Sequence, residues 1–282
     1  MKQIVYWNGD YVEKDTVTLS PDDRGFLFGD GVYEIVRAYR GRYFRRDEHL
    51  ARMLAGLEAL EIAGPTLHDL IEVSESLLER NGQQDADAII YWQVTRGAAP
   101  RTHWFPDPPV RASVYATTSP FAPKADPAVG ISVITTPDVR WARCDIKTIN
   151  LLPNCLANQR ARGLGAKEAI FVRDGIALEG TATSFFGVFG GTVVTAPKSN
   201  YILPSITRRS VIDLALRHEI PLEEKPIPFH DLDGAEELFL AGTTMEVMPI
   251  VRVDGTAIGS GSVGPITQRL QQLFDQETSR RD

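Results

Sequence analysis

The chain has 282 residues, 43% of them hydrophobic, and a formal net charge of −7 at pH 7. This length predicts about two domains with ample hydrophobic cores. The acidic balance argues against nucleic acid as the main partner, because phosphate binding needs a concentrated basic face. No apolar run approaches membrane-spanning length, and the N-terminus shows no signal peptide. Cys144 and Cys155 form no disulfide framework. We therefore expect a soluble, cytoplasmic protein.

The first part of the chain predicts a small domain that mixes helices and strands. Asn8-Gly9 is a strong two-residue turn signal and predicts a hairpin. Asp47 is placed to cap a helix with leucines and a methionine on one face, and a second helix is expected over residues 66–80. Further strands are expected at residues 33–39, 89–95 and 113–117.

The segment at residues 119–130 predicts a linker, because three prolines within nine residues favour an extended crossing. Strands dominate beyond it, at residues 131–135, 168–172, 176–179, 185–189, 193–196 and 238–240. Helices are expected at about residues 153–162, 206–218 and 265–274. We therefore predict an α/β protein made of a small α+β domain at residues 1–118, a linker at 119–130 and a larger, more closed α/β domain at 131–282.

Lys147 stands out because it lies inside an apolar run. Ile146 and Ile149 flank it, and a helix is expected to begin near Pro153. A lysine costs free energy to bury unless it has a partner or a reaction to perform. The alternative is a surface lysine on an edge strand, with its aliphatic stem covering the isoleucines. This segment alone leaves both interpretations open.

Three other features carry chemical potential. Glu179 ends an apolar strand and would need a cationic partner if buried. Ser205 is placed to cap a helix, so that the free amides of Ile206 and Thr207 would form an anion-binding terminus. Thr243 offers a hydroxyl at a strand end. Each also has an ordinary explanation: an exposed strand end, a helix cap that binds only water, and a β-forming threonine.

Most other site motifs are absent. The five histidines lack paired metal-ligand spacing, so we predict no metal site. Gly29-Asp30-Gly31 lacks the third glycine and the following helix of a dinucleotide fingerprint. A buried lysine, a phosphate cradle and a carboxylate for a protonated ring nitrogen are together what pyridoxal 5′-phosphate (PLP) requires.

At these residues the sequence resembles the class IV (fold-type IV) PLP-dependent aminotransferases, most closely the D-amino acid aminotransferase group. The likeness covers nearly the whole chain as separated matches in the same order. They lie at residues 23–34, 48–52, 94–97, 100–103, 143–147, 179–180, 202–208 and 243–246. The resemblance implies a fold-type IV architecture, with a pseudo-barrel in the larger domain.

The resemblance also implies roles in cofactor binding. Lys147 would hold PLP as an internal aldimine. It would then move a proton between the substrate Cα and the cofactor C4′, which gives the pyridoxamine form. Glu179 would pair with the pyridine nitrogen, and Leu203 would pack against the ring. The phosphate would be bound by Arg52, Ile206, Thr207 and Thr243.

For the substrate, the resemblance implies a trap for the α-carboxylate made by Tyr33, Arg101 and His103. In this family the last two residues reach in from the neighbouring subunit, so a homodimer is implied. The Arg-x-His pair distinguishes the D-amino acid group from branched-chain aminotransferases. The sequence departs from the family at Ala182 and Gly242, where hydroxyl side chains are common, and both changes bear on cofactor affinity.

The expected activity is transfer of an amino group from a D-amino acid such as D-alanine to a 2-oxo acid such as 2-oxoglutarate. The alternatives are an (R)-amine transaminase and a branched-chain L-amino acid aminotransferase. A different class of protein, a binding protein with a degenerate PLP site, would keep the fold without the chemistry.

Overall fold

The computed structural model describes residues 2–123 and 125–279, which divide between two compact units. Unit 1 comprises Met1–Ala122 and Ile146–Asn150, and unit 2 comprises Pro123–Asp145 and Leu151–Asp282. Helices and strands in both units confirm the predicted α/β class. The division at residues 1–118, 119–130 and 131–282 stays a prediction, and the short segment that carries Lys147 is counted with unit 1.

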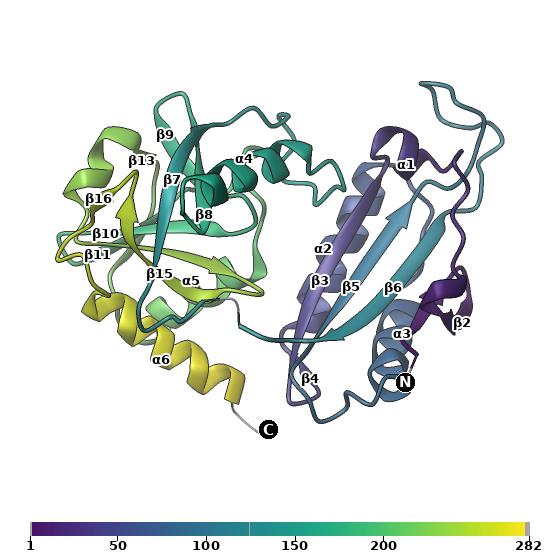
Figure 1. Cartoon of the computed structure of the whole chain (residues 1–282), viewed down its shortest axis with the longest axis horizontal. Coiled ribbons are helices and arrows are strands. Elements are labelled where there is room, and N and C mark those ends of the chain that lie inside the picture. The colour runs from purple at the N-terminus through teal and green to yellow at the C-terminus, as the bar shows by residue number, and fades with distance from the viewer. Residues whose placement is uncertain (1, 124, 280–282) are drawn as a thin grey trace. The chain divides into compact units, whose positions relative to one another are not determined.

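Unit 1 is built on a six-stranded antiparallel sheet with the strand order β2-β1-β6-β5-β3-β4 (Figure 1). Its strands are β1 (Ile4–Trp7), β2 (Asp10–Glu13), β3 (Gly31–Tyr39), β4 (Arg42–Tyr43), β5 (Ala88–Thr95) and β6 (Ser113–Pro120). Its helices are η1 (Lys14–Thr16), α1 (Arg24–Phe28), α2 (Arg46–Ala59) and α3 (Leu67–Arg80). The predicted hairpin at Asn8-Gly9 joins β1 to β2.

Side-chain alternation in this sheet sets the core of unit 1. In β5 the buried residues Ile90, Trp92 and Val94 alternate with partly exposed neighbours, as a strand with one covered face requires. They pack with apolar residues of α2 and α3 in one cluster. The prediction that Asp47 caps this helix is wrong, because α2 begins at Arg46 and Asp47 lies in its first turn. A negative charge there still interacts favourably with the helix dipole.

Unit 2 contains a ten-stranded sheet that closes on itself (Figure 1). Strand β9 pairs with both β8 and β10, so the path β10-β14-β15-β7-β8-β9 returns to β10. The strands are β7 (Ile131–Pro137), β8 (Glu168–Arg173), β9 (Ile176–Gly180), β10 (Ser184–Phe189), β11 (Thr192–Thr195), β12 (Leu222–Glu224), β13 (Ile227–Pro228), β14 (Glu237–Gly242), β15 (Glu246–Val253) and β16 (Thr256–Ala257). This closed path confirms the pseudo-barrel.

The helices of unit 2 are α4 (Leu152–Gly163), α5 (Ile206–Arg217), η2 (Phe229–Gly234) and α6 (Pro265–Ser279). The start of α4 confirms the helix expected near Pro153. Strand β15 was not predicted, because Pro249 at its centre lacks a backbone donor and ordinarily interrupts a strand. Within the described residues, none of the helices has both the length and the apolar character needed to cross a bilayer.

Helix α3 allows a direct test of which residues stabilise unit 1. Leu77 is fully buried and Leu67, on the same helix, is 38% exposed. We expect Leu77→Ala to lower the free energy of unfolding by about 2–5 kcal/mol, because it leaves a cavity. Leu67→Ala should change it by about 0.5 kcal/mol or less. Urea unfolding followed by circular dichroism measures both, and equal losses would contradict this assignment of the core.

Candidate active site

The segment that carries Lys147 is held by the backbone of β3. Strand β4 pairs only with the far end of β3, and Ile146–Asn150 occupies the edge that remains. The amide of Tyr33 donates to the carbonyl of Lys147 at 3.0 Å, and the amide of Ile149 donates to the carbonyl of Gly31 at 3.1 Å. The segment is therefore an irregular edge addition rather than a buried strand end. Lys147 is half-buried, so it is neither the fully buried lysine nor the surface lysine that the sequence left open as alternatives.

The ammonium of Lys147 lies over an aromatic surface. Its Nζ is 4.2 Å from the ring centroid of Tyr33, within cation–π range. The ring of Tyr33 stacks in turn on Tyr91, with centroids 5.9 Å apart. Burial raises the pKa of Tyr91 to about 12, so this phenol stays neutral. Lys147 thus has an aromatic neighbour that orients it, and among the described residues it forms no ion pair.

A glycine between α1 and β3 lets the lysine segment approach closely. Gly29 has φ +68°, in the left-handed region that favours glycine, and a Cβ there would overlap the side-chain oxygen of Asn150. The amide nitrogen Nδ2 of Asn150 donates to the carbonyl of Gly29 at 3.1 Å. Lys147 and two residues that follow it, Ile149 and Asn150, are therefore anchored to β3 and the turn before it.

A buried carboxylate on β3 holds Arg52. Glu34 is completely buried and accepts from Arg52 Nε at 2.9 Å and Arg52 Nη2 at 2.7 Å, a bidentate pair. His49 Nδ1 lies 3.0 Å from the same carboxylate. Burial raises the pKa of Glu34, but the guanidinium of Arg52 and the hydrogen bond from His49 outweigh it, so the pKa lies well below its ordinary value. Arg52 is thereby fixed in position on α2.

His49 completes this group as a neutral imidazole. Burial lowers its pKa, and the hydrogen bond and charge of Glu34 offset this only in part; Arg52 and Lys147 lower the pKa further. A neutral ring can donate from Nδ1 to the carboxylate. In unit 1, Lys147 is therefore oriented by Tyr33, and Arg52 is oriented by the buried carboxylate of Glu34.

Glu179 lies in unit 2, at the end of β9, and is buried with 6% of its surface exposed. Its Oε1 accepts from Arg140 Nη1 at 2.5 Å, and its Oε2 accepts from the amide of Leu203 at 3.1 Å. Arg140 also forms a two-pronged contact with Asp138, at 2.9 and 3.0 Å. Burial raises the pKa of Glu179 above its ordinary value although Arg140 lowers it, because burial is the larger effect.

The helix start predicted at Ser205 is present in the structure as the first turn of α5. Ser205 caps the helix, and its Oγ accepts from the amide of Arg208 at 3.1 Å, as predicted. The amides of Ile206 and Thr207 are the first two of the helix, and no group among the described residues accepts a hydrogen bond from them. Both residues are buried, so these two donors suit a phosphate held at the helix end.

Thr243 follows directly after β14 and is half-buried. The neighbouring strands bring this point close to Glu179, because Ser184 of β10 pairs with Glu179 on one side and with Ala241 on the other. A Cβ at Gly242 would come within 3.0 Å of the methyl group of Thr183. Thr183 therefore occupies space that a serine at position 242 would need.

Arg101 and His103 lie on the loop between β5 and β6, and both are exposed. The guanidinium of Arg101 lies 5.2 Å from the ring centroid of Phe28, and the imidazole of His103 meets the same ring edge-on at 6.0 Å. Within the described part of the single chain, neither residue makes a recorded hydrogen bond to Tyr33. The structure thus places Arg101 and His103 against one aromatic ring, and their joint action with Tyr33 stays a prediction.

Two partners of the site were missed by the sequence analysis. Glu34 gave a usable signal, since a carboxylate between the core residues Val32 and Val36 of a strand must have a cation opposite it. Arg140 gave no such signal, because it approaches Glu179 from a loop 39 residues earlier in the chain.

Cys144 carries a free, buried thiol that donates to the carbonyl of Trp141, and burial raises its pKa to about 11. This thiol is therefore poorly suited to redox chemistry.

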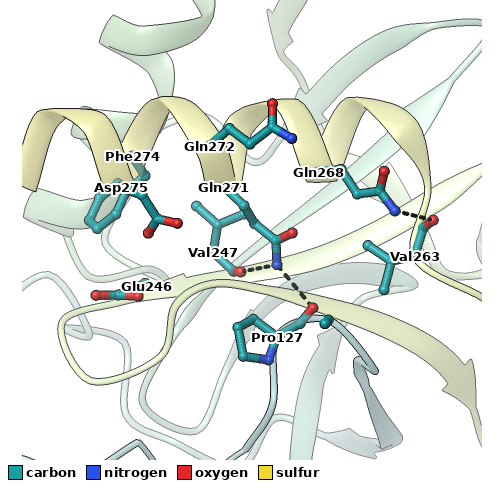
Figure 2. Close-up of a pocket in the computed structure, with 10 residues that line it drawn as sticks. Pro127, Glu246, Val247, Val263, Gln268, Gln271, Gln272, Phe274 and Asp275 are labelled. Atoms are coloured by element: carbon teal, nitrogen blue, oxygen red, sulfur yellow. Dashed lines mark hydrogen bonds between the residues drawn. The ribbon is translucent and has the colours of Figure 1, made fainter.

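A separate pocket of about 290 Å³ lies between α6 and the start of β15 in unit 2 (Figure 2). Gln271 crosses it and donates to the carbonyls of Pro127 and Val247, at 3.1 and 3.0 Å. None of the residues predicted for catalysis or cofactor binding lines this pocket. It is therefore not part of the candidate site.

The pair of Glu34 and Arg52 gives a prediction for stability and its pH dependence. Glu34→Gln removes the buried negative charge that pairs with Arg52 and should lower the free energy of unfolding by about 3–5 kcal/mol near pH 7. The pKa of Glu34 is lower in the folded state than its ordinary value of 4.5. The ionised carboxylate therefore contributes fully to the free energy of unfolding above pH 4.5, and this contribution is lost as the pH falls toward the folded-state pKa. The difference in the free energy of unfolding between Glu34→Gln and the wild type should therefore become smaller below pH 4.5.

Urea unfolding across this pH range measures this difference. Glu58→Gln, at an exposed position on the same helix as Arg52, is the matched control and should leave stability nearly unchanged. A difference that stays constant with pH would contradict the ion-pair explanation.

Comparison with known proteins agrees with this geometry. The family model for amino-transferase class IV matches residues 31–253. The chain is 41% identical over 273 residues to a D-alanine aminotransferase of Staphylococcus epidermidis, covering 96% of each chain. It is 39% identical over 269 residues to a D-alanine aminotransferase of Bacillus licheniformis, covering 95% of this chain and 94% of the relative.

A solved structure extends the likeness to the fold. The branched-chain aminotransferase of the archaeon Thermoproteus uzoniensis, solved with norvaline, has a TM-score of 0.90 and 26% identity, covering 100% of this chain and 97% of its own. The family match spans most of the chain, and both named relatives are covered almost completely. The chain therefore belongs to the class IV aminotransferases, which are PLP-dependent enzymes.

Proposed function

We propose that this protein transfers the amino group of a D-amino acid such as D-alanine to a 2-oxo acid such as 2-oxoglutarate. The observation that carries the proposal is the exposed pair Arg101 and His103, which share one loop and one aromatic support, Phe28. A guanidinium and an imidazole held side by side suit a carboxylate. The names of the curated relatives, D-alanine aminotransferase, support the same substrate class.

The residues of unit 2 fit PLP. Each oxygen of Glu179 accepts one hydrogen bond, and a carboxylate can accept more, so the N–H of a pyridinium ring can be added. In its ionised form, the carboxylate of Glu179 would favour the protonated form of that ring nitrogen. The amides of Ile206 and Thr207 at the start of α5 suit the phosphate, with Thr243 as a further donor. Arg52 lies in unit 1, and its predicted contact with the phosphate stays a proposal. Leu203, whose amide binds Glu179, is proposed to pack against the ring.

When bound, PLP supplies an electron sink for the charge that develops at the substrate Cα. Lys147 Nζ would attach the cofactor and then move a proton between the substrate Cα and the cofactor C4′. General acid–base catalysis of this kind contributes about 10²–10⁴-fold in rate. The backbone bonds between the lysine segment and β3 hold Nζ in place for this transfer.

The substrate carboxylate would be bound by Tyr33, Arg101 and His103. We propose that Arg101 and His103 act in the neighbouring active site of a homodimer. Their exposure in the single chain, beside the exposed aromatic residues Trp104 and Phe105, supports this proposal. We also propose a cytoplasmic location, which the free thiols of the chain support.

A single-turnover experiment tests the substrate class. D-Alanine should convert the PLP form of the enzyme to the pyridoxamine form, and L-alanine should react at least about 100-fold more slowly, a difference of about 2.7 kcal/mol. Arg101→Ala should raise the KM for D-alanine while leaving the absorption of the bound cofactor unchanged. Stopped-flow absorbance spectroscopy measures the conversion.

Other outcomes would point to the alternatives. Conversion by L-leucine but not by D-alanine would indicate a branched-chain L-amino acid aminotransferase. Fast conversion by (R)-1-phenylethylamine would indicate an (R)-amine transaminase in which the carboxylate trap is dispensable. A colourless protein that gains no absorption band with added PLP would indicate a binding protein with a degenerate site.

The proposed homodimer has its own test. Trp104 is 73% exposed in the single chain, and Trp104→Asp should weaken association by placing a charge in an apolar contact. Analytical ultracentrifugation should show a dimer for the wild type and a shift toward monomer for this variant. Leu216→Asp, at an exposed leucine of α5, is the control and should remain dimeric. A monomeric wild type would contradict the proposal.

A further inference from the structure

Arg24 is a buried arginine with no role in the proposed reaction. It is the first residue of α1 and almost completely buried. Its Nε donates to Asp30 Oδ2 at 2.8 Å, and its guanidinium carbon lies 4.8 Å from the ring centroid of Phe28. Burying a guanidinium is costly, so the contacts of the remaining nitrogens show what it stabilises.

Those contacts go to the loop that carries Arg101 and His103. Arg24 Nη1 donates to the carbonyl of Thr102 at 2.7 Å and to the carbonyl of Trp104 at 3.3 Å. These two carbonyls stand on either side of His103. One guanidinium therefore holds the backbone before and after the imidazole, and it also lies against the ring of Phe28 that supports both side chains.

A second arginine braces the same loop through Asp30. Arg96 donates to Asp30 from Nε at 2.7 Å and from Nη2 at 3.1 Å, and its guanidinium carbon lies 3.5 Å from the ring centroid of Phe105. The carbonyls of Leu60 and Glu61 accept from the same group. Burial raises the pKa of Asp30, but the hydrogen bonds and charges of both arginines outweigh it, and the pKa is lowered.

We propose that Arg24 is a positioning residue for substrate recognition, which sets Arg101 and His103 for the carboxylate of the amino acid. The inference rests on the proposed function of those two residues. Arg24 would not touch the substrate. Its effect would be confined to substrates that carry a carboxylate, because only these use the loop.

Lysine cannot replace Arg24 in this position. A lysine keeps the positive charge but lacks the planar guanidinium. In Arg24 that group donates from Nε to Asp30 and from Nη1 to the two loop carbonyls on either side of His103. Arg24→Lys is therefore a conservative change that releases the loop while preserving the local charge.

The experiment compares D-alanine with D-alaninol, an amine of the same shape without the carboxylate, in single-turnover reactions of the PLP-loaded enzyme. Arg24→Lys should raise the half-saturating concentration of D-alanine by about 10-fold, equivalent to about 1.4 kcal/mol. The reaction of D-alaninol should change by less than about 2-fold, and the affinity for PLP, measured by absorbance titration, should not change. Equal losses for both amines would overturn the proposal, because they would indicate general damage.

Arg37→Lys is the matched control. Arg37 is also a buried arginine of unit 1; its pairing with Asp87 and its positions over the rings of Tyr39 and Phe121 place it away from Arg24 along β3. This variant should lose thermal stability as Arg24→Lys does while keeping its affinity for D-alanine. A loss of affinity in the control equal to that of Arg24→Lys would overturn the proposal.

The double variant Arg24→Lys, Arg101→Ala separates this inference from the proposed function. If Arg24 acts through Arg101, the double variant should be no more than about 2-fold weaker for D-alanine than Arg101→Ala alone. Fully additive losses would overturn the positioning role while leaving the carboxylate trap intact. An unchanged affinity in Arg101→Ala would instead overturn the proposed trap, and the role of Arg24 with it.

Discussion

The backbone hydrogen bonds along β3 are the constraint on which the candidate site of unit 1 depends. The strand has three usable surfaces, and each holds a different part of the site. Its open edge binds the lysine segment, its core face carries Glu34 toward Arg52, and its other face carries Tyr33 beneath Lys147. Because side chains alternate along a strand, adjacent residues deliver Tyr33 and Glu34 to opposite sides of the sheet. A shift of one residue in the pairing with β5 would exchange them.

Two buried carboxylates are given opposite properties by their surroundings. Glu34 accepts two hydrogen bonds from the guanidinium of Arg52 and also contacts His49, and these interactions outweigh burial, so its pKa is lowered. Glu179 shares Arg140 with Asp138, and burial prevails, so its pKa rises. A permanently charged carboxylate suits the task of fixing Arg52. We propose that Glu179, in its ionised form, would pair with a ring nitrogen, because a negative charge beside that nitrogen favours its protonated form.

The elements with local signals were predictable from sequence. Ser205 as a cap and the helix near Pro153 follow from residues within one turn of each other. Asp47 was wrong as a cap because Arg45 adopts a left-handed conformation that starts the helix earlier. Strand β15 tolerates Pro249 because neighbouring strands on both sides stabilise it, which no local rule can show. The partnership of Arg140 with Glu179 is likewise tertiary.

We propose that PLP is attached to Lys147. Reduction of the PLP-loaded enzyme with borohydride, followed by peptide mass spectrometry, identifies the lysine that carries the cofactor. We expect a phosphopyridoxyl group on the peptide that contains Lys147, in a yield near one per chain. The same group at another lysine, with the peptide of Lys147 unmodified, would contradict this claim.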